Sequence, residues 1–277
     1  MRHCLLITVY KSPEVCNHLL ETMPEDWGAY VHIDSKSSIE PCDIYPKAVV
    51  LNEYRIYWGA VEHLKAILLM METAWKSGID FDYYHIISGE DYWGRHPSEF
   101  DSALHEGYSY VEVHPLPRQD WHNGGYDIIK YKTLASRGDI RKGLLSFENK
   151  VLKLWQIVSS TSRKTPSYPL YCGAVYCSLY KNAVQAVLDS SMSVDILNRL
   201  EGTCLGEELY FQTLLMNSEH KDRIINDCMR YIDWNVVPAP KFLTREDIDE
   251  VVSSGKLFCR KVERMELARE LDSRLNI

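Results

Sequence analysis

The chain has 277 residues, of which 45% are hydrophobic and 25% are charged, an ordinary globular composition. Its 31 basic and 39 acidic residues give a net charge of −8, which argues against a nucleic-acid partner. No apolar run approaches the ~18 residues that a membrane span requires. We therefore expect no membrane span, and a peripheral association with a membrane stays open.

The eight cysteines form no CxxC pair, and several lie in apolar runs such as RHCLLITVY and LYCGAVYC. This pattern favours buried free thiols in a reducing compartment over disulfides or a zinc site. The ten histidines contain no HExxH motif. We therefore expect a cytoplasmic protein without a bound zinc ion.

The first half of the chain alternates between strand-like and helical segments. Strands are expected at 3–10, 29–34, 48–51, 83–87 and 108–113, and helices at 13–22 and 58–78. The second helix has apolar residues at the helical period and ends at Gly78. This alternation predicts an α/β fold with a mostly parallel central sheet flanked by helices.

The middle of the chain, about 116–168, mixes basic and aromatic residues with one helical stretch. We expect it to form an insertion that covers a cleft. A strand at 170–179 and helices at about 180–190 and 206–217 follow, and a last helix begins at Thr244 and stops at Gly255. Without repeats or a clear linker, residues 1–277 are predicted to form a single domain.

Most phosphate-binding and nucleophile motifs are absent: there is no GxGxxG, GxxxxGK[ST] or GxSxG. Asp80 and Asp82 form a DxD tripeptide of the kind that holds a metal on a sugar nucleotide. This tripeptide precedes the strand at 83–87 instead of following it, so a turn between helix and strand is the preferred interpretation. No metal site is therefore predicted.

Two pairs of acids remain as candidates. Glu90 and Asp91 follow the strand at 83–87, and the carboxyl ends of strands are where ligands bind in open α/β sheets. Glu207 and Glu208 open the helix at 206–217, where acids commonly interact with the positive helix end. The structural alternatives are a solvated turn for the first pair and a favourable first-turn charge for the second.

Six segments, taken in order and spacing, resemble one family. They are YVHIDSKS, YRIYWGAVEHLKAILLMM, YYHIISGEDYW, LYCGAVYCSL, LGEELYFQTLL and SGKLFCRKV, and the likeness runs over about 3–262. The family is that of the core-2/I-branching β-1,6-N-acetylglucosaminyltransferases, which also contains the peptide O-xylosyltransferases. The resemblance implies a GT-A-type fold, a UDP-sugar donor, inversion of the anomeric centre and, as in the branching members, no metal or other cofactor.

The resemblance also implies contacts with the donor nucleotide. The implied residues are Val9 and Asp34 at the uridine, Tyr57 at or near the base, and Arg230 and Lys261 at the diphosphate. Arg260, beside Lys261, adds a third positive charge to this C-terminal group. Such cations could stabilise the leaving UDP where other enzymes use a metal.

Three further roles follow from the same resemblance. Glu208 matches the catalytic base, and Asp91 matches an acid that touches the sugar. Arg118 is the candidate for one more basic contact with the substrate from the middle segment. These roles predict a glycosyltransferase that moves a sugar, N-acetylglucosamine by expectation, onto a hydroxyl of a glycan or glycoconjugate.

Several departures from the family leave alternatives open. The vertebrate members are Golgi membrane proteins with many disulfides, whereas this chain looks like a soluble bacterial member that acts in the cytoplasm on a precursor glycan. Its segment after the helix at 206–217 is shorter than the family's acceptor-binding segment, so acceptor and linkage stay open. A transferase that uses UDP-xylose or UDP-galactose, or an inactive glycan- or nucleotide-binding module, remains an alternative.

Overall fold

A seven-stranded sheet of order β10-β6-β9-β4-β1-β2-β3 forms the centre of the computed structural model, which describes residues 1–237 and 239–277. Its strands are β1 (His3–Val9), β2 (Gly28–Ile33), β3 (Val49–Leu51), β4 (Tyr83–Ser88), β6 (Ser109–Tyr110), β9 (Ser178–Tyr180) and β10 (Ile224–Ile225). Only β9 runs against the others. The expected α/β fold with a mostly parallel sheet is confirmed.

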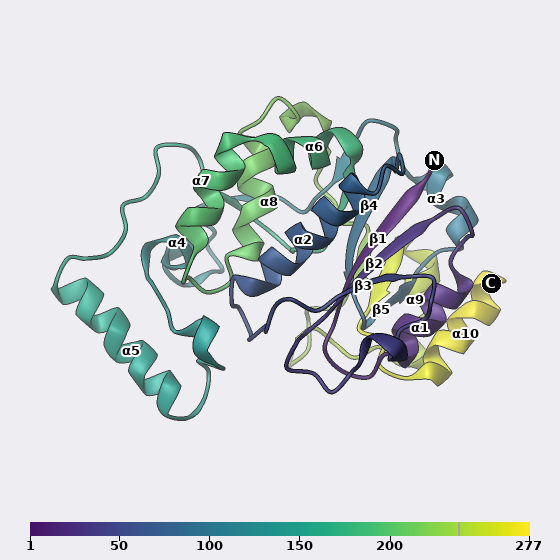
Figure 1. Ribbon diagram of the computed structural model, residues 1–277, viewed down its shortest axis with the longest axis horizontal. Helices are drawn as coiled ribbons and strands as arrows, with labels where there is room; N and C mark the ends of the chain where they lie inside the picture. Colours follow the sequence, from purple (N-terminus) through teal and green to yellow (C-terminus); the bar gives the residue numbers. More distant parts are fainter. Residues whose placement is uncertain (238) are drawn as a thin grey trace.

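Helices cover both faces of this sheet (Figure 1). One face packs against α2 (Glu62–Lys76), α6 (Lys181–Asp189), α7 (Ser191–Leu200) and α8 (Glu207–Met216), and the other against α1 (Glu14–Thr22), α9 (Ile248–Ser253) and α10 (Met265–Leu275). Strand β1 is buried on both sides: Cys4 and Leu6 point to the first layer, and Leu5, Ile7 and Val9 to the second. This explains why the first strand reads as a continuous apolar run.

A smaller sheet of order β11-β12-β5 brings the C-terminal part of the chain to the end of β4. Its strands are β5 (Asp91–Trp93), β11 (Arg230–Ile232) and β12 (Phe258–Arg260). Asp91 and Arg260 are partners in the antiparallel register of β5 and β12. The cations near the C-terminus therefore lie beside the two acids that follow β4.

The predicted strand at 170–179 is split into β8 (Tyr171–Cys172) and β9, and β8 pairs with β7 (His114–Pro115). Between them, Gly173 and Ala174 bond to helix α8, whereas the Cys177 carbonyl accepts from the Ile86 amide of β4 at 2.9 Å. The Gly173 amide donates to the Glu208 carbonyl at 2.9 Å, and the Gln212 side chain donates to the Ala174 carbonyl at 2.8 Å. These bonds hold the segment against the start of α8.

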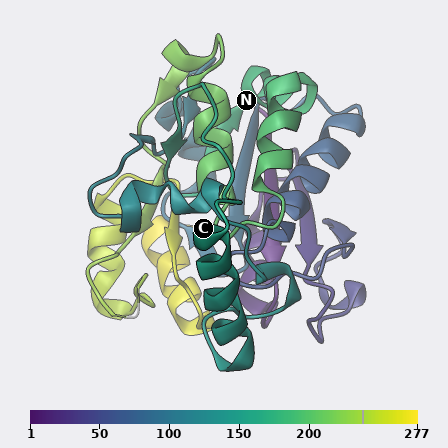
Figure 2. The same cartoon turned by 90° about the vertical axis from the view of Figure 1, so that its left-hand side faces the viewer.

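The middle segment contains α4 (Asp127–Lys130) and α5 (Gly143–Val158). Helix α5 extends from one end of the molecule in Figure 1 and stands in front of the remainder in Figure 2. Just before α5, the Arg141 guanidinium lies 4.4 Å from the centre of the Trp58 ring. The segment also touches the main body through the Thr133 amide, which donates to the Gly202 carbonyl at 2.7 Å, and the Ser136 hydroxyl, which donates to Glu62 at 2.9 Å, while α5 itself points outward.

The cysteines and helices also bear on the expectations from composition. All eight cysteines are free, and five are buried: Cys4, Cys16, Cys172, Cys177 and Cys259. The expectation of buried free thiols is confirmed for these five. None of the helices in the described ranges has the length and apolar character needed to cross a bilayer.

Candidate active site

Three of the expected nucleotide contacts meet where β1 and β2 end. The Asp34 amide donates to the Val9 carbonyl at 2.8 Å, because these parallel neighbours end side by side. The Asp34 carboxylate accepts from the amides of Lys36 and Ile56, each at 3.1 Å, and also from the Lys36 ammonium. The Tyr57 ring lies 5.4 Å from that ammonium. Val9, Asp34 and Tyr57 therefore form one group, to which Lys36 belongs.

The loop that carries Tyr57 is tied to the segment before helix α8. The Leu205 amide donates to the Gly59 carbonyl at 2.7 Å, and Ala60 forms an isolated β-bridge with Cys204. Gly59 has a φ of +69°, and a side chain there would begin 2.6 Å from the Cys204 sulfur. Only glycine fits this position. The close contact holds the loop that carries Tyr57 against the segment that leads into Glu207 and Glu208.

The two acids at the start of α8 have different surroundings. Glu207 is buried, and its carboxylate lies 3.5 Å from Nδ1 of His63, whose Nε2 lies 3.4 Å from the Thr8 hydroxyl at the end of β1. Glu208 is half-buried, and no hydrogen bond to its carboxylate is found among the described residues. Glu207 therefore anchors α8 to β1, whereas Glu208 keeps its carboxyl group available.

The pKa of Glu208 is raised to about 8. Burial is the main cause, the negative charges of Glu207 and Glu112 add to it, and the Arg118 guanidinium opposes it. A carboxyl group with such a pKa exchanges its proton near neutral pH, as a general base must. The structure thus separates two adjacent acids that the sequence left equivalent on charge alone.

Arg118 lies on the same side as Glu208, at the start of the middle segment. Its Nε donates to Asp120 at 2.7 Å, and its guanidinium is 3.9 Å from the Glu112 carboxylate and 5.1 Å from the centre of the Trp121 ring. Glu112 follows β6 and had not been singled out in the sequence, because a lone acid after a strand carries no motif. Arg118 and Glu112 together adjust the charge around Glu208.

A cluster of cations lies where β1 and β12 end. Lys11 pairs with Glu90 at 2.8 Å, and the ammonium groups of Lys11 and Lys261 lie 5.6 and 5.1 Å from the centre of the Phe242 ring. Burial lowers the pKa of Lys261, as do the positive charges of Arg260 and Lys11, while Glu90 opposes this. Lys11 also lies 3.8 Å from the Glu263 carboxylate, whereas Lys261 forms no ion pair among the described residues, which leaves its charge for an anionic ligand. Lys11 had not been predicted.

Comparison with known proteins assigns the chain to a family. The family model of the Core-2/I-Branching enzymes matches residues 29–252. The chain belongs to the Core-2/I-Branching enzyme family. The predicted family is thereby confirmed, as is the glycosyltransferase class that it implies.

One solved structure and one negative result complete the comparisons. The apo form of mouse xyloside xylosyltransferase 1 is similar at 10% sequence identity, with a TM-score of 0.36 over 84% of this chain and 89% of that chain. A likeness at that level does not bear on the substrate. No curated protein matches this branching-family sequence.

Within this branching-family fold, Asp91 has a different place from the sugar contact that was expected. It is fully buried, and one carboxylate oxygen accepts from the Ser88 amide at 2.7 Å, the Ser88 hydroxyl at 2.6 Å and Arg260 at 3.3 Å. The Arg260 guanidinium in turn lies 3.9 Å from the centre of the Tyr176 ring. Asp91 therefore positions Arg260 and does not itself line the surface.

Arg230 likewise does not fit the expected diphosphate contact. It is buried, and its guanidinium donates to the carbonyls of Cys177 at 2.7 Å and Ile86 at 3.1 Å, to the Ser178 hydroxyl at 2.6 Å and to the Cys228 carbonyl. These oxygens occupy both terminal nitrogens. The Arg230 guanidinium thus bonds to buried oxygens in the interior of the sheet.

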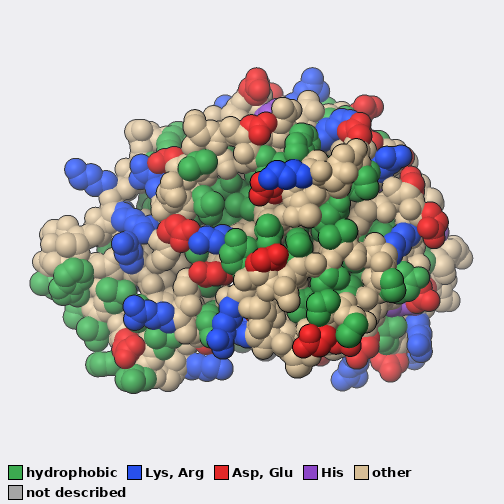
Figure 3. All heavy atoms as spheres, in the orientation of Figure 1, with side chains coloured by type: hydrophobic (Ala, Val, Ile, Leu, Met, Phe, Trp, Pro, Cys, Tyr) green, Lys and Arg blue, Asp and Glu red, His purple; other side chains and the backbone are tan. Residues whose placement is uncertain are grey.

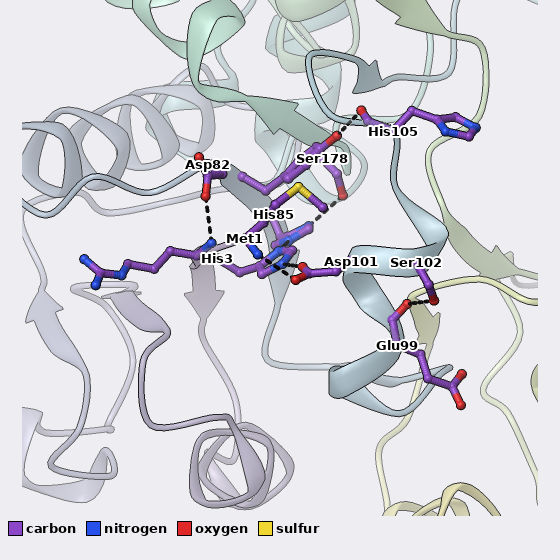
Figure 4. A network of polar contacts seen from close by, with 11 residues as sticks. Met1, His3, Asp82, His85, Glu99, Asp101, Ser102, His105 and Ser178 are labelled. Carbon is purple, nitrogen blue, oxygen red and sulfur yellow. Dashed lines mark hydrogen bonds and ion pairs between the residues drawn. The ribbon is translucent and has the colours of Figure 1, made fainter.

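The Ser178 hydroxyl belongs to a polar chain that runs across the neighbouring strands β9, β4 and β1 (Figure 4). It bonds to His85 at 2.7 Å, His85 to His3 at 2.8 Å and His3 to Asp101 at 2.9 Å, and Asp101 pairs with the amino group of Met1 at 2.6 Å. Burial holds the pKa of His85 well below its usual range, so this ring is neutral. The chain joins the N-terminus to the region around Arg230.

The DxD tripeptide lies at the start of β4, at the opposite end of that strand from Glu90. Asp80 and Asp82 both pair with Lys181, at 3.2 and 3.0 Å. This placement agrees with the interpretation as a turn between helix and strand. In the part of the chain that the structure describes, His, Cys, Asp and Glu side chains form no group of three or more able to hold a metal ion.

Proposed function

We propose that this branching-family glycosyltransferase moves N-acetylglucosamine from its UDP-sugar to a hydroxyl group of a glycan or glycoconjugate, with inversion at the anomeric carbon. The observation that carries the proposal is Glu208, a half-buried carboxyl group with a pKa raised to about 8. It is the kind of base that can take a proton from an acceptor hydroxyl near neutral pH. An inverting transfer needs one such base.

The other residues of the candidate site would bind different parts of the UDP-sugar. Val9, Asp34 and Tyr57 would bind the uridine, with Tyr57 offering a ring surface for the base. Lys11 and Lys261 would bind the diphosphate, where negative charge grows as UDP leaves. Because side chains supply this positive charge, we propose that the transfer needs no metal ion.

The acceptor oxygen would attack the anomeric carbon while Glu208 takes its proton and the bond to the UDP oxygen breaks. The base and the leaving group then lie on opposite faces of the sugar, and the configuration inverts. Arg118, next to Glu208, would contact the substrate at this side of the site. The free cysteines support a cytoplasmic place of action.

Measurement of UDP release from a panel of UDP-sugars tests the proposal. UDP-N-acetylglucosamine should give the fastest release, and a glycan acceptor should increase it. Faster release from UDP-xylose or UDP-galactose would assign another donor to the same site. Binding of UDP without release from any sugar would instead show an inactive nucleotide-binding module.

A further inference from the structure

The outward face of α5 carries a continuous row of apolar side chains. Leu144, Phe147, Val151, Leu154 and Val158 follow one another at spacings of three and four residues, so they share one side of the helix. All five are between 49% and 78% exposed. In Figure 3, hydrophobic side chains gather at the end of the molecule where Figure 1 places α5, with Lys and Arg side chains beside them. We refer to these five residues as the α5 stripe.

The opposite face of α5 carries polar side chains that contact the rest of the protein. Gln156 exchanges two hydrogen bonds of 2.9 Å with the backbone of Lys132, and Asn149 accepts from the Leu134 amide at 2.9 Å. Lys153 pairs with Asp127 at 2.6 Å. The polar face is therefore turned toward the protein and the apolar face toward solvent, the reverse of a surface helix in a globular protein.

Charge distinguishes the possible occupants of the α5 stripe. Residues 116–168 contain 10 of the 31 basic residues but only 4 of the 39 acidic ones, a net charge of +6, which leaves −14 on the rest of the chain. The exposed basic side chains closest in sequence to the stripe are Lys132, Arg137, Arg141, Lys142, Lys150 and Lys164. A second copy bound through α5 would bring two such positive segments together. An anionic surface would attract them.

We propose that α5 docks this enzyme on the surface of a membrane that contains anionic lipids. A helix with Leu, Phe and Trp on one face and basic residues nearby lies in the boundary between headgroups and acyl chains. The basic residues interact with negative headgroups while the apolar side chains enter the acyl region. Trp155, also exposed beside the α5 stripe, belongs to the residue types that favour this boundary.

The docking helix is joined to the candidate active site. Gly143, the first residue of α5, follows Arg141 by two residues, and Arg141 covers Trp58, which is adjacent to Tyr57. A membrane bound to the α5 stripe would therefore hold the site at a fixed distance from the lipid surface. That arrangement suits an acceptor glycan carried by a lipid.

Vesicle binding tests docking without reference to sugar transfer. The wild-type protein should co-sediment with vesicles of phosphatidylcholine and phosphatidylglycerol, bind less at high salt, and bind poorly to phosphatidylcholine alone. The double variant Phe147→Glu/Leu154→Glu should reduce binding about tenfold or more, since it places two charges in the apolar face. Val194→Glu, the same change at an exposed position of α7, is the matched control and should bind like the wild type.

Reversal of two positive charges tests the electrostatic contribution to vesicle binding. Lys142→Glu/Lys150→Glu should also weaken binding to anionic vesicles, whereas Lys76→Glu on α2 should not. Wild-type protein that stays in solution, or a Phe147→Glu/Leu154→Glu variant that binds as well as the wild type, overturns the proposal. A wild-type dimer that this variant disperses, without vesicle binding, would assign the α5 stripe to a second copy. Release of UDP in solution should be unchanged in these variants, so a failure of the proposed function would be seen separately.

Discussion

The proposed chemistry of the site depends on one of two adjacent acids. The Glu207 carboxylate contacts His63, which links it to β1. Burial raises the pKa of Glu208 to about 8, so its carboxyl group stays protonated up to about that pH. Family resemblance pointed to Glu208 in the sequence, but position in the first turn could not separate it from Glu207. The difference arises from burial and from the charges of Glu112 and Arg118, which only the folded chain brings together.

The raised pKa of Glu208 leads to a prediction about pH. A base works only when it has lost its proton, so the rate of UDP release should rise with pH around a midpoint of about 8. Arg118 lowers the pKa of Glu208, so Arg118→Ala should move the midpoint to higher pH. The pH profile of kcat in the two proteins measures both effects. A midpoint near the ordinary value of a glutamate would exclude Glu208 as the base.

Arg230 and Lys261 show that the direction of a side chain could not be predicted from the sequence. Both are basic residues at strand ends, and the resemblance gave both to the diphosphate. In the fold, Arg230 is enclosed by carbonyl and hydroxyl oxygens, while Lys261 lies with Lys11 near Phe242. Tertiary contacts decide the direction of a side chain at the end of a strand. No local pattern in the sequence indicates that direction.

These two residues should therefore respond differently to substitution. Lys261→Ala and Lys11→Ala should weaken the binding of UDP about tenfold, roughly the effect of one charge-assisted hydrogen bond, and leave uridine binding unchanged. Arg230→Ala should instead lower the free energy of unfolding by about 3 kcal/mol, because several buried oxygens lose their donor. Calorimetric titration and thermal unfolding separate the two outcomes. Equal loss of UDP affinity in a fully stable Arg230→Ala protein would show that Arg230 binds the diphosphate after all.

At the scale of elements, most of the sheet was predictable and its interruptions were not. The strands at 3–10 and 83–87 and the helix at 206–217 agree with β1, β4 and α8 to within one residue at either end. Their apolar runs and helical period carry strong local signals. The strand expected at 170–179 was wrong between Cys172 and Ser178, because α8 supplies hydrogen bonds to that stretch. Helices α7 and α10 were not predicted.

Gly173 marks the closest approach between the split strand and its surroundings. A side chain at this position would begin 2.0 Å from the carbonyl oxygen of Glu112, a backbone atom that cannot move alone. Gly173→Ala should therefore lower the free energy of unfolding by about 3 kcal/mol and reduce kcat, since the start of α8 must shift. Thermal unfolding measures the first effect and UDP release the second.

Gly107→Ala is the matched control for this substitution. Gly107 has a φ of +85°, and nothing lies within 4 Å of an added side chain, so the variant should lose only about 1 kcal/mol. If the two alanine variants are equally stable and active, the tight contact at Gly173 does not position α8.

At the scale of the whole molecule, the site forms where the parallel strands β1, β2 and β4 end together. That was predictable, because ligands bind at the carboxyl ends of strands in open α/β sheets. The part played by the C-terminal segment was not evident from local pattern: β12 crosses to β5 and places Arg260 and Lys261 beside the end of β4. The pairing joins residues more than 160 positions apart in sequence.

The proposed metal independence would be a property of the assembled site. Lys11 and Lys261 would supply positive charge where the diphosphate lies, and Asp80 and Asp82 both pair with Lys181 at the far end of β4. UDP release should therefore continue in excess EDTA at close to its original rate. Loss of activity on chelation, with recovery on addition of manganese, would show that carboxylates bind a metal during transfer.

The proposed mechanism depends on Glu208 as the base, and the most direct test compares UDP release in Glu208→Gln and Glu207→Gln. Glu208→Gln should lower kcat by about 100-fold or more, the scale expected for loss of a general base, with UDP affinity and thermal stability maintained. Glu207→Gln should change kcat far less, because its carboxylate contacts His63 and not the acceptor. A Glu208→Gln enzyme with near-normal kcat, or an exchange of the two phenotypes, would contradict the account.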